Sequence, residues 1–409
     1  MSKHRNHLIL IGCIGIVLLG LLGCFDINLV RNVIGGTLET IEDPDVSSVA
    51  SANTRFGFKL LQDLRERDPG GNIFISPLSI SIALTMTYNG AVGETERAMA
   101  EVLEIDALDL STINNSNKAL RNSLENPDPK VEISIANSIW SRQGVNFNAD
   151  FLERNREFFG AEIASLDFSS PQAAATINEW VDTNTNGKIE KIVDRINPQT
   201  LLFLINAIYF KGNWQDEFDK ALTRPGIFHL PNGSEKQVQM MRREGEYPYL
   251  RGENFEATSL PYGAGRVSMY IFLPNRDSNL NKFLGDLNAE NWKGWISQLG
   301  NRTQTMMLPR FKLEYEVRLN DTLEALGMGI AFGGGADFSG MGPSLFISEV
   351  RHKTFVEVNE EGTEAAAVTA VVGVKSVPSI FRVDRPFFFA IYDAETETIL
   401  FMGTVTEPM

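Results

Sequence analysis

Apolar residues at helical spacing predict helices in the first half of the chain. Between Val49 and Leu64 they recur every three or four positions, and the pattern ends ahead of a Pro-Gly-Gly turn. Two further segments open on a Ser-Pro pair, in which the serine can cap the helix and the proline suits its first position. These pairs are Ser76-Pro77, ahead of a helix to Asn89, and Ser170-Pro171, ahead of a helix through Val181.

Alternating apolar and polar residues predict strands, most of them in the second half of the chain. Val131, Ile133 and Ile135 alternate with polar neighbours. Leu201–Phe210 is nearly all apolar, as in a strand buried on both faces, yet Asn206 lies in its middle. The other predicted strands are Arg266–Leu273, Phe311–Val317, Phe346–Val358, Phe387–Tyr392 and Thr398–Val405. Since no repeat or internal linker separates these segments, they predict one large α+β domain.

The first residues have the pattern of an export signal. Two basic residues precede an apolar run from Leu8 to Leu22, 15 residues long, whereas a membrane span needs about 20. The run ends in Leu-Leu-Gly-Cys24, which resembles the lipobox of exported lipoproteins, where cleavage precedes a cysteine that becomes lipidated. We therefore expect a lipoprotein signal peptide at residues 1–23, a linker at 24–46 and the folded domain at 47–409. Cleavage with release and an uncleaved anchor are the alternatives.

Composition and charge exclude several classes of protein. Of 409 residues, 43% are hydrophobic and 22% charged, which is typical of soluble globular proteins and not of disordered or multi-pass membrane chains. The net charge of −15 argues against a nucleic-acid surface. Removal of the signal leaves one cysteine and only two histidines, His229 and His352, which are too few for a Cys- or His-ligated metal site. We expect no metal and no cofactor.

The sequence lacks familiar catalytic motifs. It holds no G-x-S-x-G elbow, Walker loop or H-E-x-x-H helix, and the glycines between Gly327 and Gly335 miss the spacing of a dinucleotide-binding loop. A serine hydrolase would have to use His229, which precedes a turn, or His352, which lies in a predicted strand. We therefore expect no catalytic residues, with an envelope hydrolase dependent on His352 as an alternative.

Residues 360–376 differ from the rest of the domain. They are rich in Ala, Val and Thr, follow an already complete strand, and precede Pro378, which should break strand pairing. In an extended conformation one face would present Thr363, Ala365, Ala367, Thr369, Val371 and Gly373, all small or β-branched and uncharged. Such a strand could slide between two existing strands, with its small face toward the core.

The segment Glu360–Ala367 resembles the hinge of the serpin family of serine protease inhibitors. Three other stretches agree with family motifs and occur in family order: Asn72–Ser79, Asn206–Trp214, and Arg385–Phe389 with Phe401–Gly403. The resemblance, to a serpin of the prokaryotic lipoprotein type, implies one α+β domain of about eight to nine helices and three β-sheets, with an exposed reactive-centre loop. It also implies suicide inhibition, in which a protease cleaves the loop and stays covalently trapped while the loop inserts into the central sheet.

The same resemblance implies partners and a location. The partner would be a target serine protease, held in a covalent complex, and no nucleic acid would bind. The inhibitor would be a monomer with a risk of loop–sheet polymers. It would lie outside the cytoplasm, either secreted or anchored to the cell membrane through a lipid on Cys24. A serpin that binds other molecules without inhibiting proteases is the alternative within the family.

The resemblance further assigns roles to residues around the central sheet. The hinge would comprise Glu360, Glu361, Gly362, Thr363, Glu364, Ala365, Ala366 and Ala367. Ser76, Ser79, Asn206 and His352 match the shutter, a hydrogen-bonded cluster beneath the opening sheet. Trp214 and Arg310 match the breach, where the loop enters the sheet, and Arg310 would pair with Glu360 there.

Family spacing also positions the scissile bond. Counted from Gly362, the bond lies between Ser376 and Val377, and the bond between Lys375 and Ser376 is the alternative. The first choice suggests an elastase-like or subtilisin-like target that prefers small side chains. The second suggests a trypsin-like target, whose pocket holds a cation.

Overall fold

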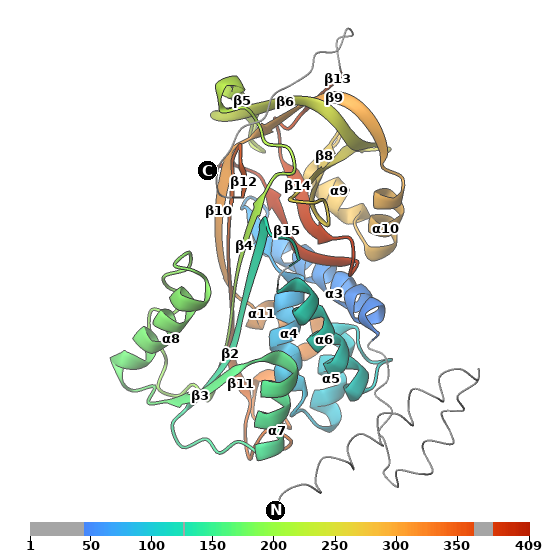
Figure 1. The fold of residues 1–409 in the computed structure, drawn as a ribbon. Coiled ribbons are helices and arrows are strands. Elements are labelled where there is room, and N and C mark those ends of the chain that lie inside the picture. Colours follow the sequence, from blue (N-terminus) through green and yellow to red (C-terminus); the bar gives the residue numbers. More distant parts are fainter. Residues whose placement is uncertain (1–44, 126, 364–378) are drawn as a thin grey trace, which may run out of the picture. The chain divides into compact units, whose positions relative to one another are not determined.

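The computed structural model describes residues 45–125, 127–363 and 379–409 (Figure 1). Their α-helices are α3 (Val46–Arg67), α4 (Pro77–Tyr88), α5 (Gly93–Leu103), α6 (Leu110–Leu124), α7 (Ala149–Arg154), α8 (Pro171–Asn184), α9 (Leu280–Asp286), α10 (Ala289–Ser297) and α11 (Asn320–Leu323). Shorter π or 3₁₀ turns are η1 (Asn155–Phe159), η2 (Lys220–Leu222), η3 (Glu324–Met328) and η4 (Gly329–Phe332).

The strands of the described residues form two hydrogen-bonded sheets. The first joins β10 (Phe311–Arg318), β11 (Ile347–Val358), β4 (Leu202–Asn213), β2 (Val131–Arg142) and β3 (Glu162–Leu166) in that order, with β12 (Gly362–Thr363) beside β4. The second joins β1 (Ile73–Ile75), β15 (Thr398–Val405), β14 (Phe387–Asp393), β8 (Val267–Pro274), β7 (Phe255–Pro261), β6 (Glu235–Arg251), β9 (Gly300–Pro309) and β13 (Ser379–Arg382), with β5 (Arg224–His229) on β6.

The α+β class and the number of helices agree with the prediction, whereas hydrogen bonding joins the strands into two sheets where three were expected. The long strand β6 is the reason. Its first residues pair with β5, its middle with β9, and its last three with β7, so it links two sets of strands into one ladder.

Local signals explain why the two Ser-Pro helices begin where they do. The Ser76 hydroxyl accepts a hydrogen bond from the Ser79 N–H at 3.2 Å, and Pro77 occupies the first turn of α4. Ser170 caps α8 in the same way and accepts from the Gln172 N–H at 3.3 Å. Both predicted caps are therefore confirmed.

Two hydrophobic cores cover the faces of the first sheet. The main core is formed by buried side chains of the two sheets and of helices α3, α4 and α6, which lie beside the sheets in Figure 1. A smaller core lies on the other face, where α8 and the segment after it cover β2, β4 and β11. In β4 the residues Phe203, Ile205, Ala207 and Tyr209 belong to the smaller core, and Leu202, Leu204, Ile208 and Phe210 to the main one. The all-apolar pattern of this strand thus reflects burial on both faces.

The seam between β11 and β4 is hydrogen-bonded along only part of its length. The two strands run parallel and pair directly from Ile347 with Leu202 to Phe355 with Tyr209. Beyond Phe355, β11 pairs only with β10, and the end of β4 pairs instead with β2 and β12. We call the paired stretch the closed end of the seam and the unpaired stretch the open end.

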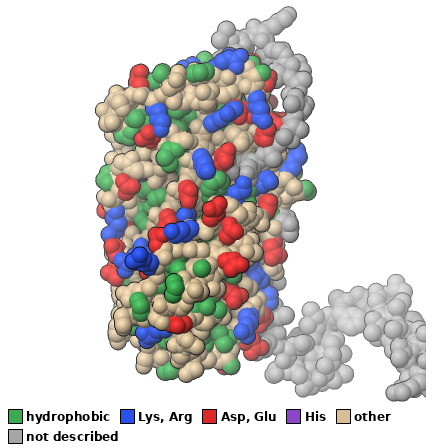
Figure 2. All heavy atoms as spheres, turned by 90° about the vertical axis from the view of Figure 1, so that its left-hand side faces the viewer, with side chains coloured by type: hydrophobic (Ala, Val, Ile, Leu, Met, Phe, Trp, Pro, Cys, Tyr) green, Lys and Arg blue, Asp and Glu red, His purple; other side chains and the backbone are tan. Residues whose placement is uncertain are grey.

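Neither the charges on the face drawn in Figure 2 nor the helices of the described residues suggest a nucleic-acid surface or a membrane-spanning helix. The face in Figure 2 intersperses Lys and Arg with Asp and Glu, and no broad area of one sign is visible among its described residues. Within the described part of the chain, no helix has the length and apolar character needed to cross a membrane.

Candidate functional site

A buried hydrogen-bond network lies under the closed end of the seam. The cross-strand pairs place His352 of β11 beside Asn206 of β4, and Asn206 beside Asn137 of β2. The His352 Nδ1 shares a hydrogen bond with the Asn206 Oδ1. The Asn206 amide nitrogen in turn donates to the Ser79 hydroxyl and to the Asn137 Oδ1. Three strands are therefore joined through one asparagine.

The first turn of α4 completes this network. Its N-cap, Ser76, donates its backbone N–H to the His352 Nε2 at 3.1 Å and caps Ser79 through its hydroxyl. Because Nε2 accepts this bond, the proton of the neutral imidazole lies on Nδ1, where it can be donated to Asn206. The four residues that resemble the family shutter thus contact one another directly in the fold.

His352 is held in its neutral form. It is fully buried, and burial lowers the pKa of its imidazole to about 3. Both ring nitrogens are engaged in hydrogen bonds, and the side chain has no exposed surface. A substrate therefore has no route to this histidine, which argues against the hydrolase alternative.

Two buried hydrogen-bonding residues at the closed end, Asn137 and Thr354, are not predicted from the sequence. Asn137 follows Val131, Ile133 and Ile135 at the same two-residue period, so an amide on an otherwise apolar strand face was the available signal. Thr354 donates its hydroxyl to the Phe74 carbonyl oxygen at 2.6 Å and ties β11 to the strand that precedes α4. A buried threonine in an alternating strand carries no comparable signal.

At the open end of the seam, Trp214 lies at the end of β4 and is 1% exposed. Its ring stacks on Tyr262, with centroids 4.4 Å apart. The indole Nε1 donates to the Asn359 carbonyl oxygen and the backbone N–H donates to the Glu361 carbonyl oxygen, both at 2.9 Å. One tryptophan therefore holds the turn through which the chain leaves β11.

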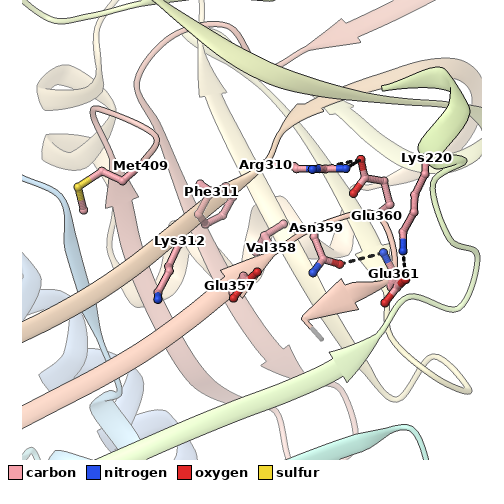
Figure 3. A pocket seen from close by; sticks show the side chains of 10 residues that line it. All are labelled: Lys220, Arg310, Phe311, Lys312, Glu357, Val358, Asn359, Glu360, Glu361 and Met409. Carbon is pink, nitrogen blue, oxygen red and sulfur yellow. Dashed lines mark hydrogen bonds and ion pairs between the residues drawn. The ribbon is translucent and has the colours of Figure 1, made fainter. Parts of the chain in front are cut away.

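Glu360 carries the buried charge of this turn. Its side chain is 1% exposed, and its Oε1 accepts from the Arg310 Nε at 2.8 Å and from the Thr223 hydroxyl. Burial by itself would raise the pKa of Glu360, but the hydrogen bonds from Arg310 and Thr223 outweigh it and hold the pKa below its ordinary value. Arg310 and Glu360 thus form the ion pair that the resemblance implied (Figure 3).

A shallow pocket of about 280 Å³ opens beside this pair (Figure 3). Lys220 lines it and forms an ion pair with Glu361, whose backbone N–H donates to the Asn359 Oδ1 at 3.0 Å. On its far side Lys312 fixes the last residue, because its backbone N–H donates to the Met409 carbonyl oxygen at 2.9 Å. The pocket therefore lies beside the open end of the seam, and most of the charged side chains that line it already form ion pairs.

Gly362 makes the closest backbone approach at the open end. It has φ +135°, and a Cβ built on it would lie 2.2 Å from the Gly212 carbonyl oxygen and 2.6 Å from the Asn213 Cα. Only glycine fits a position with that φ and that spacing. From there Gly362 pairs with Asn213, and Thr363 pairs with Gly212. The two residues Gly362 and Thr363 therefore form a short strand against β4.

Several predicted residues lie outside the described part of the chain: Glu364, Ala365, Ala366, Ala367, Lys375, Ser376, Val377 and Cys24. Residues 1–23 and the linker through position 44 lie outside it as well. Among the described residues, no group of three or more His, Cys, Asp and Glu side chains is placed to hold a metal ion.

Comparison with known proteins gives a consistent result. The family model described as serpin (serine protease inhibitor) matches residues 51–408. A serpin-like protein of Thermococcus kodakarensis is 37% identical over 382 residues, covering 90% of this chain and 88% of its own. The leukocyte elastase inhibitor of Equus caballus is 38% identical, covering 89% of this chain and all of its own. Among solved structures, native tengpin, a thermophilic serpin, has a TM-score of 0.83 at 34% identity, covering 90% of this chain and 95% of its own.

Proposed function

The chain belongs to the serpin family, and on that premise we propose that it inhibits serine proteases by the suicide mechanism. A protease would cleave the segment after the hinge and form an acyl-enzyme. The cleaved segment would then enter the seam between β4 and β11 as a new central strand. The attached protease would be carried along and trapped covalently.

The observation that carries this proposal is the start of β12 at the open end of the seam. Gly362 and Thr363 already pair with β4, where β11 has left it. Continued at the same register, the following residues would pass between β4 and β11. Gly212, the partner of Thr363, shares the two-residue period of Phe210, a residue of the main core. If an inserted strand kept this register, position 363 and every second residue after it would face the core side, where small residues fit.

Hydrogen bonding alone cannot drive this insertion. Each inserted residue gains roughly 1 kcal/mol of net hydrogen-bond energy, and ordering it costs roughly 1–2 kcal/mol. The small side chains of the segment bury little apolar area. The driving force would therefore have to be stored in the intact sheet, which is a metastable arrangement in this proposal.

The scissile bond and the class of target remain parts of the proposal. We assign the bond to Ser376-Val377, with Lys375-Ser376 as the alternative, on family spacing alone. Ser376 would suit an elastase-like or subtilisin-like protease, and the name of the leukocyte elastase inhibitors among the relatives supports this choice. Lys375 would suit a trypsin-like protease.

The location and assembly of the protein also belong to the proposal. The apolar run before Cys24 supports export and a lipid anchor on that cysteine, with residues 1–23 removed and 24–46 as a tether for the domain at 47–409. A monomer is the functional form. An opened seam that accepts a segment of its own chain could accept the same segment of a second copy, which would produce loop–sheet polymers.

The test is adduct formation with a panel of trypsin, subtilisin and elastase. The wild type should form an SDS-resistant adduct with at least one of them, and mass spectrometry of the released peptide should identify the bond. Thr363→Arg places a long cation on the core side of the inserted strand, so it should be cleaved as a substrate, with adduct yield reduced at least about tenfold.

Glu364→Arg is the matched control, because it introduces the same arginine side chain one position later, on the opposite face of the strand, with a charge change of +2 in place of +1. It should retain adduct formation. If every protease only degrades the wild type, inhibition is wrong and a non-inhibitory binding serpin is favoured. If both arginine variants lose the adduct equally, the proposed register of the inserted strand is wrong.

A further inference from the structure

The exposed face of β6, β9 and β13 carries a row of side chains that the inhibitory mechanism does not use. Met307 of β9 is the direct cross-strand neighbour of Arg242 on β6 and of Arg382 on β13. Directly paired residues point to the same face of a sheet, so the two arginines flank Met307 on one side. Their chain neighbours Met241 and Phe381 are buried on the other side.

Both arginines are exposed and have no hydrogen-bond or ion-pair partner among the described residues. The next row on the same face consists of Glu244, Thr305 and Ile380. Ile380 is 55% exposed, the largest exposed fraction of a hydrophobic side chain within a described strand. The face therefore presents two unpaired guanidinium groups beside an exposed apolar side chain, in a chain whose net charge is −15. We name Arg242, Met307, Ile380 and Arg382 the β13 surface.

The β13 surface lies close in sequence to the proposed scissile bond. Strand β13 begins at Ser379, two residues beyond Val377, at the end of the molecule where Figure 1 labels β5, β6, β9 and β13. At up to about 3.6 Å per residue, the Cα of Arg382 lies within about 18 Å of the Cα of Val377. A protease seated on that bond would therefore lie within reach of this surface.

From this placement we infer that the β13 surface is a secondary docking site for the target protease, and that the protease presents carboxylates and an apolar residue beside its active-site cleft. The inference rests on the proposed function. Unpaired arginines suit this role because they can form bidentate bonds to carboxylates without first breaking an internal ion pair. Against the one carboxylate of the next row, Glu244, the two arginines leave this face with a local positive charge. That charge offsets the repulsion that an acidic inhibitor exerts on an acidic protease and so accelerates their encounter.

The test compares the wild type with an Arg242→Ala/Arg382→Ala double variant against whichever protease of the panel forms the adduct. We expect the second-order rate of adduct formation at low salt to fall about tenfold. The difference should shrink to less than about twofold in 1 M NaCl, where charges are screened within about 3 Å. The number of inhibitor molecules consumed per protease should not change, because the inserting strand is intact.

Arg251→Ala is the matched control. Arg251 is an exposed arginine on the same strand β6, nine residues from Arg242, and its loss should leave the rate within about twofold of the wild type. A second readout uses the protease with its catalytic serine replaced by alanine, for which the double variant should raise the Kd of the non-covalent complex about tenfold.

The possible outcomes distinguish failure of the docking site from failure of the proposed protease inhibition. If the adduct forms at the same rate and with the same salt dependence in wild type and double variant, the β13 surface is not a docking site, and the proposed inhibition still stands. An equal loss in Arg251→Ala also overturns the docking site, because a diffuse charge effect would then explain the result. Absence of any adduct overturns both proposals.

Discussion

The two ends of the seam between β4 and β11 are built from different chemistry. At the closed end, His352, Asn206 and Asn137 form a neutral, buried row across three strands, and hydrogen bonds join them to one another and to the first turn of α4. At the open end, buried Glu360 depends on Arg310, whose side chain is 43% exposed. The strands there are separated and the first residues of the hinge lie against β4.

This difference indicates where an incoming strand can begin. Opening the closed end would expose several buried polar groups at once, each of which costs about 1–3 kcal/mol when left unpaired. The open end needs no such break, since β11 and β4 are already unpaired there. Opening should therefore proceed from the Trp214 end toward His352, where the network is the largest polar barrier along the paired stretch.

The largest expected effect comes from removing the centre of the closed end. Asn206→Ala leaves the His352 Nδ1–H, the Ser79 hydroxyl and the Asn137 Oδ1 without their shared partner. The free energy of unfolding should fall by about 3 kcal/mol, measured by denaturant unfolding followed by fluorescence.

The control for this variant is Asn197→Ala. Asn197 is an exposed loop asparagine that caps only its own turn, and its loss should change the stability by less than about 0.5 kcal/mol. Equal losses from the two substitutions would show that the network contributes nothing beyond an ordinary surface amide.

A second, smaller effect is the pH dependence of stability, which should differ between the two ends of the seam. The folded pKa of His352 is about 3, against an ordinary value of 6.5, so below pH 6.5 the unfolded chain binds a proton that the folded chain rejects. Stability should fall as the pH falls through this range, by at most about 1.4 kcal/mol per pH unit from this group. In His352→Gln the fall between pH 6.5 and pH 5 should be shallower by about 2 kcal/mol.

The open end should respond only at lower pH. The pKa of Glu360 lies below its ordinary value of 4.5, so its ion pair stabilises the hinge above that pH, and the contribution is lost as the pH falls through the folded pKa. Identical pH profiles for the wild type and His352→Gln between pH 6.5 and pH 5 would contradict the assignment of that range to the closed end.

The smallest expected effect is at the hinge itself. Glu360→Gln keeps the shape of the side chain and removes its charge, so the attachment to Arg310 should weaken by about 1 kcal/mol. At neutral pH the spontaneous loss of inhibitory activity on warming should become about fivefold faster, measured by residual adduct formation.

Glu361→Gln provides the comparison for the hinge. Its partner, Lys220, is 63% exposed, and an exposed pair contributes little, so the rate should change less than about twofold. If Glu361→Gln accelerated the loss of activity more than Glu360→Gln, the exposed pair with Lys220, and not the buried pair with Arg310, would hold this segment in place.

Local signals predicted much of the scaffold. The Ser-Pro caps of α4 and α8, the period of α3 and the runs that became β4, β11, β14 and β15 all have the predicted positions within a few residues. Strand β6 gave no such signal, because Glu235–Arg251 is largely polar, and it is a strand through its pairing with β5, β9 and β7. Helix α6 was missed because its Asn- and Ser-rich sequence has low helical propensity.

Some residues of the candidate site were likewise predicted from the sequence, and others were not. Asn206 was found because an amide within an apolar run needs buried partners, and the pairing of Arg310 with Glu360 came from the family resemblance. Thr223 and Tyr262 were not found, because each acts only through a neighbour brought to it by folding: Glu360 for Thr223 and Trp214 for Tyr262.

The amino-acid sequence by itself determined the helix caps, the periods of the main strands and the run of small residues after the hinge, because each depends on neighbours a few positions away. Only the tertiary structure decided where β11 leaves β4 and which carboxylate is buried beside that gap. Strands separated by more than 130 residues carry no local record of their pairing. Their pairing ends at Phe355 and Tyr209, and beyond that point Gly362 and Thr363 pair with β4 in place of β11.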